Sequence, residues 1–511
     1  MELSALIRFR IVLACSVCAV LLLSVGCGSP ASTDPHQLIS VSSTANPLVA
    51  QYNLRLFKPG SSAWVEFGTD TNYGRRTSAV TDSTPSTGVS SLNILVAGMM
   101  PQTTYHMRAH VSNNDGEWVD QDRTFTTGSL PQGVVAPHVT VSTPTPGLAP
   151  SPGAEMLSLV SNATTSQTLQ AVVTDLHGNL IWYCPQPALP PRPLPNGHFL
   201  FQENVRVEEV DLACNSIRSV SVAQVNQSLQ AQGYTIPPIS GFHHDAIALP
   251  SGHWIALGQV AKDYTDLPGY PGTTEVLGDV LVDVDLDGNV AWAWSAFDFL
   301  DVNRHLEGLP DWTHSNAIVD TADGNLLLSM RHQSWILKID YQNGTGSGNI
   351  LWRLGQDGDF SIAGGDPTQW FYGQHYPYIV DTNGTQTTMA VYDDGNYRID
   401  STGTACDPTV TPPTCYSRAP IIQIDEVTHQ STLLWEYLPG FFSPWGGSIG
   451  TLPNGNVEFD SSAPLSVGNS QIIEVTQTDS PQIVWQMNII GQAAYRGFRI
   501  PSLYPGITWE Q

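Results

Sequence analysis

The chain has 511 residues, of which 41% are hydrophobic, and it contains 44 glycines and 37 prolines. This length is enough for two or more folded domains, each with a buried core. Only 13% of the residues are charged, yet the formal net charge is −26, so the surface is acidic and would repel the phosphates of a nucleic acid. We therefore exclude nucleic acid as a partner, and we find no amphipathic helix typical of membrane-surface binding.

Residues 1–27 have the pattern of an export signal. Two arginines precede an apolar run at 11–25, whose length of about 15 residues is short of the roughly 20 that cross a bilayer. The stretch 23–27, LSVGC, also resembles a bacterial lipobox, which would make Cys27 the lipidated first residue of the mature protein. We expect an exported protein in the periplasm or outer envelope, anchored through Cys27, with residues 28–36 as a tether. Ordinary cleavage nearby is the alternative.

Removal of the signal leaves four cysteines, at 184, 214, 406 and 415. In an exported chain, this pattern favours disulfides. Cys406 and Cys415 bracket the short stretch DPTVTPPT, so we predict that they pair, and Cys184–Cys214 would then be the second bridge. A cysteine-based metal site is less favoured, because no two of these cysteines have CxxC spacing.

Residues 37–128 show short runs of period 2 between turn residues, which predicts a β-sandwich. The segment LVAGMMPQTTYHMR at 95–108, followed by TFTTG at 124–128, resembles a fibronectin type III domain, in which a tyrosine after the turn packs at a corner of the sandwich. We expect a spacer or an oligomerisation module without a catalytic role. Residues 129–153 are rich in Pro, Ser, Thr and Gly, and we interpret them as a linker.

Residues 154–511 contain a two-part repeat. An apolar strand follows a turn, and then a strand ending in Asp is followed by a second turn and usually a tryptophan. We count six units, centred near 175, 210, 285, 345, 430 and 480, and the unit near 210 lacks the tryptophan. Many short strands with little helical periodicity predict an all-β fold, a six-bladed β-propeller. The recurring tryptophans are expected to pack one blade against the next.

Three histidines occupy one position of this repeat. His243 opens HHDAI, His314 opens HSNAI and His375 opens HYPYI, each with an isoleucine four residues later. Equivalent positions in a repeat fold point toward the same axis, so we predict one shared site. The alternation of a regular strand would turn His244 to the opposite face, and the register favours His243. The same register adds Trp445 to the site.

Two chemistries suit such a group of histidines. One is a metal site, for which Asp245 and Asn316 would share the histidine face only if the strands stay regular. The other is an apolar cleft of phenol size, suggested by aromatic residues nearby in sequence: Trp312, Trp335, Trp370, Phe371, Tyr372, Tyr376 and Tyr378. Arg331, near the end of LLLSMRHQ, favours the second, because a planar guanidinium binds sulfate or phosphate oxygens in pairs. A salt bridge to a loop carboxylate is the alternative for Arg331.

These residues resemble the bacterial PAPS-independent arylsulfate sulfotransferases over most of 154–511. The resemblance is carried by HHDAIALPSG, DWTHSNAI, SMRHQSWILKID, NILWRLG, GQHYPYI, VYDDGN and AAYRGFRIPSLYP. It implies a six-bladed propeller behind a small sandwich, which moves a sulfuryl group from a phenolic sulfate to another phenol in the periplasm. It also implies that His375 is the nucleophile, that His314 and Arg331 are the second histidine and the arginine, and that His243 is the first histidine.

The implied mechanism is ping-pong, through a sulfohistidine. The expected partners are a phenolic sulfate donor and a phenol acceptor, and a homodimer is left open. No nucleotide is required, since the sequence has neither a P-loop nor a GxGxxG motif, and we expect no other cofactor. No metal ligand is assigned, and an ion in the channel stays open. Two alternatives stay open: a propeller lipoprotein that only binds a ligand or acts as a scaffold, and an aryl sulfate hydrolase that uses water as the acceptor.

Overall fold

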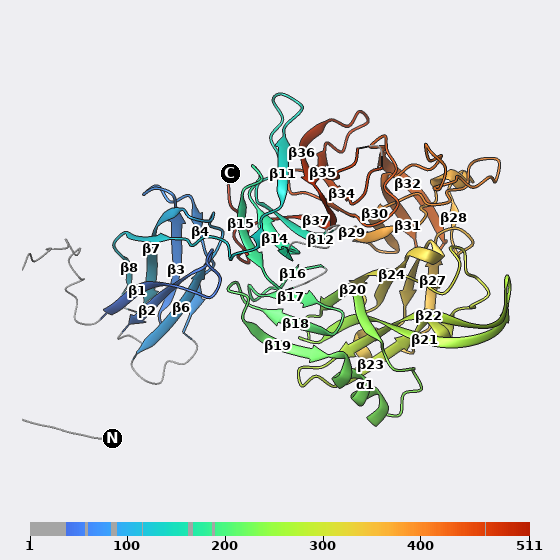
Figure 1. Cartoon of the computed structure of the whole chain (residues 1–511), viewed down its shortest axis with the longest axis horizontal. Helices are drawn as coiled ribbons and strands as arrows, with labels where there is room; N and C mark the ends of the chain where they lie inside the picture. Colours follow the sequence, from blue (N-terminus) through green and yellow to red (C-terminus); the bar gives the residue numbers. More distant parts are fainter. Residues whose placement is uncertain are drawn as a thin grey trace, which may run out of the picture. The chain divides into compact units, whose positions relative to one another are not determined.

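A computed structural model describes residues 37–56, 60–82, 89–114, 116–161, 167–186, 190–465 and 467–510. The chain divides into Met1–Gln37 and a compact unit, Leu38–Gln511, and the predicted signal (1–27) and tether (28–36) lie outside the described residues. The fold is nearly all β, as predicted (Figure 1). None of the helices in the described part of the chain has the length and hydrophobicity that a bilayer crossing requires.

The N-terminal strands form two sheets around a shared core. One sheet contains β1 (Gln37–Ser43), β2 (Ala50–Leu56) and β6 (Ser90–Val96), and the other contains β4 (Arg75–Arg76), β3 (Ser62–Gly68), β7 (Thr104–Asn113) and β8 (Gly116–Val119), with β5 (Val80–Thr81) on β3 and β9 (Arg123–Thr126) on β7. Alternate residues of β2, β6 and β7 are buried, as their period of 2 predicts. The Met100 amide donates to the Tyr105 hydroxyl at 3.0 Å, which closes the turn before β7.

Six further sheets of four or five strands each follow among the described residues. The first sheet has β12 (Ala154–Ser161), β14 (Ala171–Thr174), β15 (Leu180–Cys184) and β37 (Gln492–Ile500). The second sheet has β16 (Arg192–Pro193), β17 (Phe199–Gln202), β18 (Arg206–Val210) and β19 (Ser216–Ser221). The third sheet has β20 (Gly241–Ala248), β21 (Trp254–Leu267), β22 (Tyr270–Val284) and β23 (Val290–Ser295). The fourth has β24 (Ser315–Asp320), β25 (Leu326–Met330), β26 (Trp335–Ile339) and β27 (Ile350–Leu354); the fifth has β28 (Ser361–Ile362), β29 (His375–Asn383), β30 (Gln386–Tyr392), β31 (Ala419–Asp425) and β32 (Gln430–Tyr437); the sixth has β11 (His138–Ser142), β33 (Ser448–Thr451), β34 (Val457–Ser461), β35 (Ser470–Val475) and β36 (Ile483–Ile490).

Short helices interrupt the strands. They are α1 (Val222–Ala231), α2 (Ala296–Phe299) and the 3-10 turns η2 (Arg331–Gln333), η3 (Gln342–Gly344) and η4 (Pro367–Gln369). Helix α1 starts at a capping box, because the Ser221 hydroxyl accepts from the Gln224 amide and the Gln224 side chain accepts from the Ser221 amide. The turn η2 contains Arg331, one of the residues that the sequence predicts for the site.

The sheets are joined at their outer strands by tryptophan indoles. Six indole N–H groups donate to a turn between two strands of the next sheet, at distances between 2.8 and 3.2 Å: Trp182 to Leu212 O, Trp292 to Gly346 O, Trp294 to Gly348 O, Trp352 to Glu426 Oε2, Trp435 to Thr478 O and Trp485 to Leu176 O. The last of these runs from the sixth sheet back to the first. Buried apolar clusters also lie between each pair of neighbouring sheets. The prediction that these tryptophans pack between repeats is confirmed.

The second sheet uses an arginine where the others use tryptophan. Arg218 in β19 donates through Nη1 to Gly252 O at 2.9 Å and through Nη2 to Asp285 O, both in the third sheet. Its guanidinium also lies 3.7 Å from the centre of the Trp254 ring. The unit near 210 therefore keeps the contact to its neighbour although it lacks the tryptophan.

Strands from both ends of this region complete the first and sixth sheets. The C-terminal β37 pairs with β12, and β11 pairs with β36. The stretch 129–153, which its composition predicts as a linker, thus contains a strand of the sixth sheet and also β10 (Val134–Val135), which pairs with β13 (Gln167–Thr168). The five residues of β11 alternate in exposure, but the prolines and glycines around them dominate the composition and hide this period.

Both predicted disulfides are present. Cys406 pairs with Cys415 within one loop, and Cys184 pairs with Cys214. Cys184 lies in β15 of the first sheet and Cys214 lies in the turn before β19 of the second sheet. This second bridge therefore joins two sheets at the same edge at which Trp182 does.

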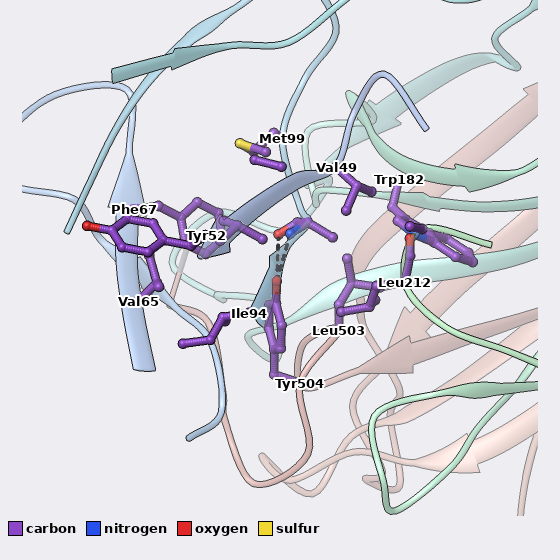
Figure 2. Packing of buried hydrophobic residues seen from close by; sticks show 14 of the residues in the cluster. Val49, Tyr52, Val65, Phe67, Ile94, Met99, Trp182, Leu212, Leu503 and Tyr504 are labelled. Carbon is purple, nitrogen blue, oxygen red and sulfur yellow. Dashed lines mark hydrogen bonds between the residues drawn. The ribbon is translucent and has the colours of Figure 1, made fainter. Parts of the chain in front are cut away.

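The N-terminal sheets share a buried core with the first two of the six sheets and with the C-terminal segment (Figure 2). The Ala97 amide donates to the Tyr504 hydroxyl at 2.7 Å, and that hydroxyl donates to Leu95 O at 2.9 Å. The Met99 amide donates to Ile181 O at 2.9 Å. Tyr504 thus ties the end of the chain to β6 and its following turn.

We predict that Tyr504→Phe destabilises the protein by about 1–3 kcal/mol, because it leaves the buried Ala97 amide without its acceptor. The measurement is the midpoint of urea unfolding followed by tryptophan fluorescence. Tyr397→Phe is the control, since Tyr397 is 44% exposed. Equal midpoints for Tyr504→Phe and the wild type would contradict this account of the shared core.

Candidate active site

The histidines predicted to share a site lie at the start of neighbouring strands. His243 and His244 are in β20, His314 immediately precedes β24, and His375 opens β29. The strands β17, β20, β24, β29, β33 and β37 contact one another in that order. The structure therefore brings these residues to one region.

The strands β20, β24 and β29, at which the histidines lie, each begin with an irregular register. The pairing shifts between Phe242 and Ala246, between Ser315 and Ala317, and between His375 and Tyr378. Three residues there have positive φ: His244 at 60°, His314 at 46° and Tyr376 at 46°. Such bulges redirect side chains that a regular strand would turn to the opposite face.

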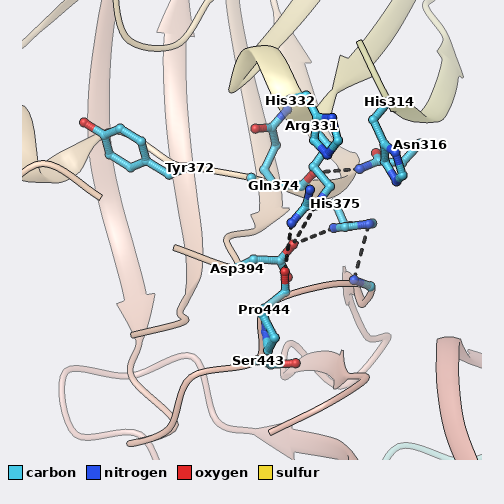
Figure 3. Close-up of polar contacts among 12 residues, drawn as sticks. His314, Asn316, Arg331, His332, Tyr372, Gln374, His375, Asp394, Ser443 and Pro444 are labelled. Carbon is cyan, nitrogen blue, oxygen red and sulfur yellow. Dashed lines mark hydrogen bonds and ion pairs between the residues drawn. The ribbon is translucent and has the colours of Figure 1, made fainter. Parts of the chain in front are cut away.

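His375 is buried, with 2% of its surface exposed, and both of its ring nitrogens have partners (Figure 3). Nδ1 lies 2.7 Å from Asp394 Oδ2, and the Gly446 amide donates to Nε2 at 3.3 Å. Because Nε2 accepts a hydrogen bond, we assign the proton to Nδ1. Burial, and then the positive charges of Arg331 and of His314, hold the pKa of His375 well below its usual value. The side chain is therefore a neutral imidazole with its lone pair on Nε2.

Asp394 is completely buried beside His375. Burial raises the pKa of Asp394 well above its usual value, and the Arg331 guanidinium opposes this rise. A protonated Asp394 would donate to Nδ1 and would move the ring proton to Nε2, where the Gly446 amide requires an acceptor. The hydrogen bonds thus favour an Asp394 carboxylate that accepts from Nδ1.

Arg331 is held in place by two contacts. Its Nη1 donates to Glu307 Oε2 at 3.0 Å and its Nη2 donates to Pro444 O at 2.9 Å. Its Nε is 4.0 Å from Asp394 Oδ2, and among the described residues it has no hydrogen-bond partner. The loop-carboxylate salt bridge that the sequence left open for Arg331 is therefore present, and the guanidinium still lies beside the His375–Asp394 pair.

His244 faces the other histidines, together with His243. The two Nδ1 atoms are 2.7 Å apart, and the His244 ring centre lies 4.7 Å from that of His314 and 5.7 Å from that of Tyr495. Burial, and then His243, His314 and His375, hold the pKa of His244 well below its usual value. Strand alternation predicts the opposite face for His244, and the bulge with its positive φ is the reason for the difference.

His314 and His332 form a second pair on the other side of the site. Their rings stack with centres 4.5 Å apart, and Nδ1 of His314 lies 2.5 Å from Asp311 Oδ2. His332 Nδ1 lies 2.6 Å from Asp311 O. Ligand atoms of Asp311, His314 and His332 fall within 4.8 Å of one another, which is the spacing of a metal site. These groups already bind each other, so we assign no metal to them.

Asp245 and Asn316, which lie two residues after His243 and His314, point elsewhere. Asp245 pairs with Arg192, whose Nη2 lies 2.6 Å from Asp245 Oδ2, and it also accepts from the Ile318 amide. Asn316 donates to Gln374 O at 2.7 Å. Both side chains therefore hold neighbouring strands together.

A cavity of about 580 Å³ opens next to the histidines. Its wall contains Val160, Val205, Phe242 and Trp445 with the polar residues Gln170, Gln202, Glu203, Asn204, His243, His244 and Tyr495. Trp445 and Tyr495 connect the cavity to His375, since Gly446 follows Trp445 and the Tyr495 ring centre lies 5.9 Å from that of His375. Most aromatic residues that the sequence placed nearby instead pack in cores: Trp312, Trp335, Trp370, Phe371 and Tyr372.

Sequence reasoning missed four polar residues of this region: Glu307, Asp311, Asp394 and Tyr495. Asp394 lies in VYDDGN and Tyr495 in AAYRGF, which are two of the stretches that carry the family resemblance. The Tyr495 hydroxyl is buried without a hydrogen-bond partner among the described residues, and burial raises its pKa to about 12. Asp311 is only three residues from His314, whereas Asp394 and Tyr495 are far in sequence from the histidines that they approach, so the spacing of Asp394 and Tyr495 gives no sign of these contacts.

Solved structures resemble this chain only at low identity. They include a protein of unknown function from Bacteroides caccae (11% identity, TM-score 0.41, 68% of this chain and 100% of that chain covered). A periplasmic gluconolactonase of Pseudomonas aeruginosa has 12% identity and a TM-score of 0.30, with 74% and 94% covered. A Synechocystis apocarotenoid oxygenase mutant has 12% identity and a TM-score of 0.34, with 91% and 96% covered. At these identities and TM-scores, the similar structures indicate neither the fold nor the activity of this chain.

A comparison with curated proteins finds no match. The family model described as Arylsulfotransferase (ASST) matches residues 146–496, which is more than half of the chain. This match spans His243, His314, Arg331 and His375. The chain therefore belongs to the arylsulfotransferase (ASST) family.

Proposed function

We propose that the six sheets are the blades of a six-bladed β-propeller, with residues 154–511 as the catalytic domain, and that residues 37–128 are a fibronectin III-like sandwich. Support for the propeller comes from the side-chain contacts that run from each sheet to the next and return to the first. The pairing of β11 and β37 with sheets at the other end of the repeat also favours closure. The Tyr105 hydroxyl at the turn before β7 supports the sandwich assignment.

We propose that this protein transfers a sulfuryl group from a phenolic sulfate ester to a phenol through a sulfohistidine at His375. The observation that carries the proposal is the state of His375, a buried neutral imidazole with its lone pair on Nε2 and a guanidinium nearby. A neutral imidazole is a nucleophile, and the positive charge of an arginine favours binding of the anionic sulfuryl group that the imidazole attacks.

The reaction has two half-reactions. Nε2 of His375 attacks sulfur in line, the N–S bond forms, the S–O bond to the donor breaks, and its electron pair leaves with the phenolate oxygen. The acceptor phenol then gives up its proton, its oxygen attacks the same sulfur, and the electron pair of the N–S bond returns to Nε2. The sulfuryl group crosses from one phenol to the other without a nucleotide, which is a ping-pong scheme.

The neighbouring groups have separate roles in this scheme. Arg331 supplies positive charge for the sulfuryl oxygens, and the Gly446 N–H lies next to the attacking nitrogen. His314 or His243 donates a proton to the leaving phenolate oxygen and later takes the proton of the acceptor. Free phenols have a pKa of about 10, so this proton transfer is a moderate contribution and stabilisation of the sulfuryl charge is the larger one.

The cavity beside Trp445 is proposed to hold the aromatic ring of donor and acceptor in turn. Val205, Phe242 and Trp445 offer apolar surface there, while His243 and His244 stand at its inner side. A cavity of about 580 Å³ is in the range of small-molecule sites. The same cavity serves both substrates, because a ping-pong enzyme binds them one after the other.

We propose that the protein is exported to the periplasm or outer envelope and anchored by a lipid on Cys27, which lies outside the described residues. Two disulfides support an oxidising compartment. A homodimer stays a prediction that size-exclusion chromatography can measure.

We predict that His375→Ala abolishes both covalent labelling and sulfuryl transfer. The wild-type protein, mixed with 4-nitrophenyl sulfate and quenched at alkaline pH, should gain the mass of one sulfuryl group, and added phenol should discharge it. His177→Ala, at an exposed turn, should behave like the wild type.

Other outcomes separate the alternatives. A wild-type protein without any adduct or nitrophenol release would falsify the enzyme assignment and favour a ligand-binding or scaffold role. Release of nitrophenol at one rate with and without phenol would instead indicate that water is the acceptor and that the protein is a hydrolase.

We predict that Arg331→Lys lowers the rate of sulfo-enzyme formation by about 10²–10³-fold, because lysine keeps the charge but loses the planar donor fork. The measurement is rapid quench at saturating 4-nitrophenyl sulfate. Arg353→Lys, at a partly exposed pair with Asp359, is the matched control. A variant of normal melting temperature with an unchanged rate would show that Arg331 only holds Glu307.

The rate of sulfo-enzyme formation should stay level from about pH 8 to about pH 6, because a histidine with an unshifted pKa near 6.5 would lose its lone pair in this range and His375 would not. The sign follows from the lowered pKa of His375, which moves its protonation to more acidic pH. The measurement is the nitrophenol burst at saturating donor, read after an alkaline quench. A midpoint near pH 6.5 would contradict the buried, neutral state assigned to His375.

A further inference from the structure

Asp394 is a fully buried carboxylate to which no sequence pattern gives a role. It follows β30, and its Oδ2 lies 2.7 Å from Nδ1 of His375 and 4.0 Å from Nε of Arg331. Its Oδ1 is buried without a hydrogen bond among the described residues. Burial of a carboxylate is costly unless the charge is used by a partner. The partner in contact with this one is the proposed nucleophile.

The turn that carries Asp394 is fixed by other groups. The neighbouring Asp393 accepts from Arg398 at 2.8 Å, from Arg418 at 2.7 Å and from the Tyr372 amide at 2.9 Å. The Ser417 hydroxyl donates to the backbone carbonyl of Asp394 at 2.7 Å. Asp393 therefore holds the turn, and the Asp394 side chain is left to contact His375.

We propose that Asp394 is a positioning residue of the transfer reaction, which keeps a proton on Nδ1 of His375 and neutralises the charge that the ring gains when sulfur bonds to Nε2. This inference rests on the proposed function, because it concerns the same histidine. The inference gives the Asp394 carboxylate the same role, to hold the Nδ1 proton, in both half-reactions. The hydrogen bonds of Asp394 and of the Gly446 amide select the same tautomer.

The charges balance in each step. Before attack, the ring is neutral and Asp394 is a carboxylate. When the Nε2–S bond forms and the S–O bond of the donor breaks, the electron pair leaves with the phenolate, and the ring becomes an imidazolium that keeps its Nδ1 proton. When the acceptor oxygen bonds to sulfur, the Nε2–S bond breaks and its electron pair returns to the ring. A charged ring is a better leaving group than a neutral one, so the carboxylate supports the second step as well as the first.

The other charged groups around Asp394 set its proton affinity. Arg331 favours the carboxylate, whereas the acidic groups of Asp393, Glu307 and Asp460 act in the opposite direction. If Asp394 took the proton from Nδ1, a neutral sulfoimidazole would remain, which is a slower sulfuryl donor. Arg331 opposes that transfer. The arginine thus acts on the reaction partly through Asp394.

The test compares Asp394→Asn, which is nearly isosteric, with Asp283→Asn, which changes a buried carboxylate of β22 whose partners are Tyr341 and His253. The amide can donate to Nδ1 and thereby move the ring proton to Nε2, as in other histidine–aspartate pairs. We expect Asp394→Asn to slow both formation and discharge of the sulfo-enzyme by about 10²–10⁴-fold, with little change in the KM of the donor. Asp283→Asn should retain the wild-type rates.

A second measurement does not depend on catalysis. In ¹⁵N-histidine-labelled resting protein, His375 should show a protonated Nδ1 and an unprotonated Nε2, with the Nδ1 proton at low field. His375→Gln identifies these signals by their loss. Asp394→Asn should lose the low-field proton or exchange the two nitrogen signals, whereas Asp283→Asn should keep them. If Asp394→Asn fails to fold, Asp394→Glu replaces it, and it should keep the tautomer but lower both rates.

The outcomes separate this inference from the proposed function. Wild-type rates in a folded Asp394→Asn variant, or an Nε2 proton in the wild-type spectrum, would overturn the role of Asp394 while leaving the sulfohistidine in place. A wild-type protein that forms no adduct would remove the proposed function, and with it the catalytic role of Asp394, even if the low-field proton is present.

Discussion

The arrangement of the six sheets depends on one contact that recurs between neighbours, a side chain of the outer strand that donates to the adjacent sheet. Trp182 and Trp485 show both ends of the series, since they link the first sheet to the second and the sixth back to the first. Arg218 makes the same link from the second sheet with two hydrogen bonds and a contact to the Trp254 ring. Each tryptophan combines a hydrogen bond with a large apolar surface, so the same side chain fixes the relative orientation of two sheets and packs between them. The positions of the site residues follow from that orientation.

The irregular starts of β20, β24 and β29 convert this scaffold into a site. A regular strand presents every second residue to one side, which would offer one histidine per strand. The shift in β20, with φ of 60° at His244, turns His244 toward His314, while the adjacent His243 stays in contact with His244. Positive φ in non-glycine residues costs energy and is commonly found at functional sites. His314 and Tyr376 have positive φ, as His244 does, and all three lie at the irregular starts of these strands.

Much of this organisation could be predicted from the sequence, because it is local. The turns, the short strands, the recurrent tryptophans and the four cysteines each leave a pattern in consecutive residues. Asp394 and Glu307 leave none, since their contacts to His375 and Arg331 join separate segments. Strand alternation predicts the wrong face for His244, because the bulge at the start of β20 depends on tertiary pairing. Strand β11 was hidden by the prolines around it, although it completes a sheet with residues more than 300 positions away.

The net charge of −26 and an anionic substrate are compatible because many of the acidic groups lie in surface turns, where the fold uses them. In several outer turns an aspartate accepts from backbone amides two to four residues later, as Asp175, Asp211, Asp285 and Asp425 do. These carboxylates stabilise turns at the surface, and salt screens exposed charges beyond about 8 Å at physiological ionic strength. Near His375, the fixed charges include the buried guanidinium groups of Arg331 and Arg496, beside the neutral imidazole of His375. The charges near His375, rather than the net charge of the whole chain, therefore decide which anion can approach the site. A sulfate monoester has a smaller negative charge than a polyphosphate, so the acidic surface repels it less.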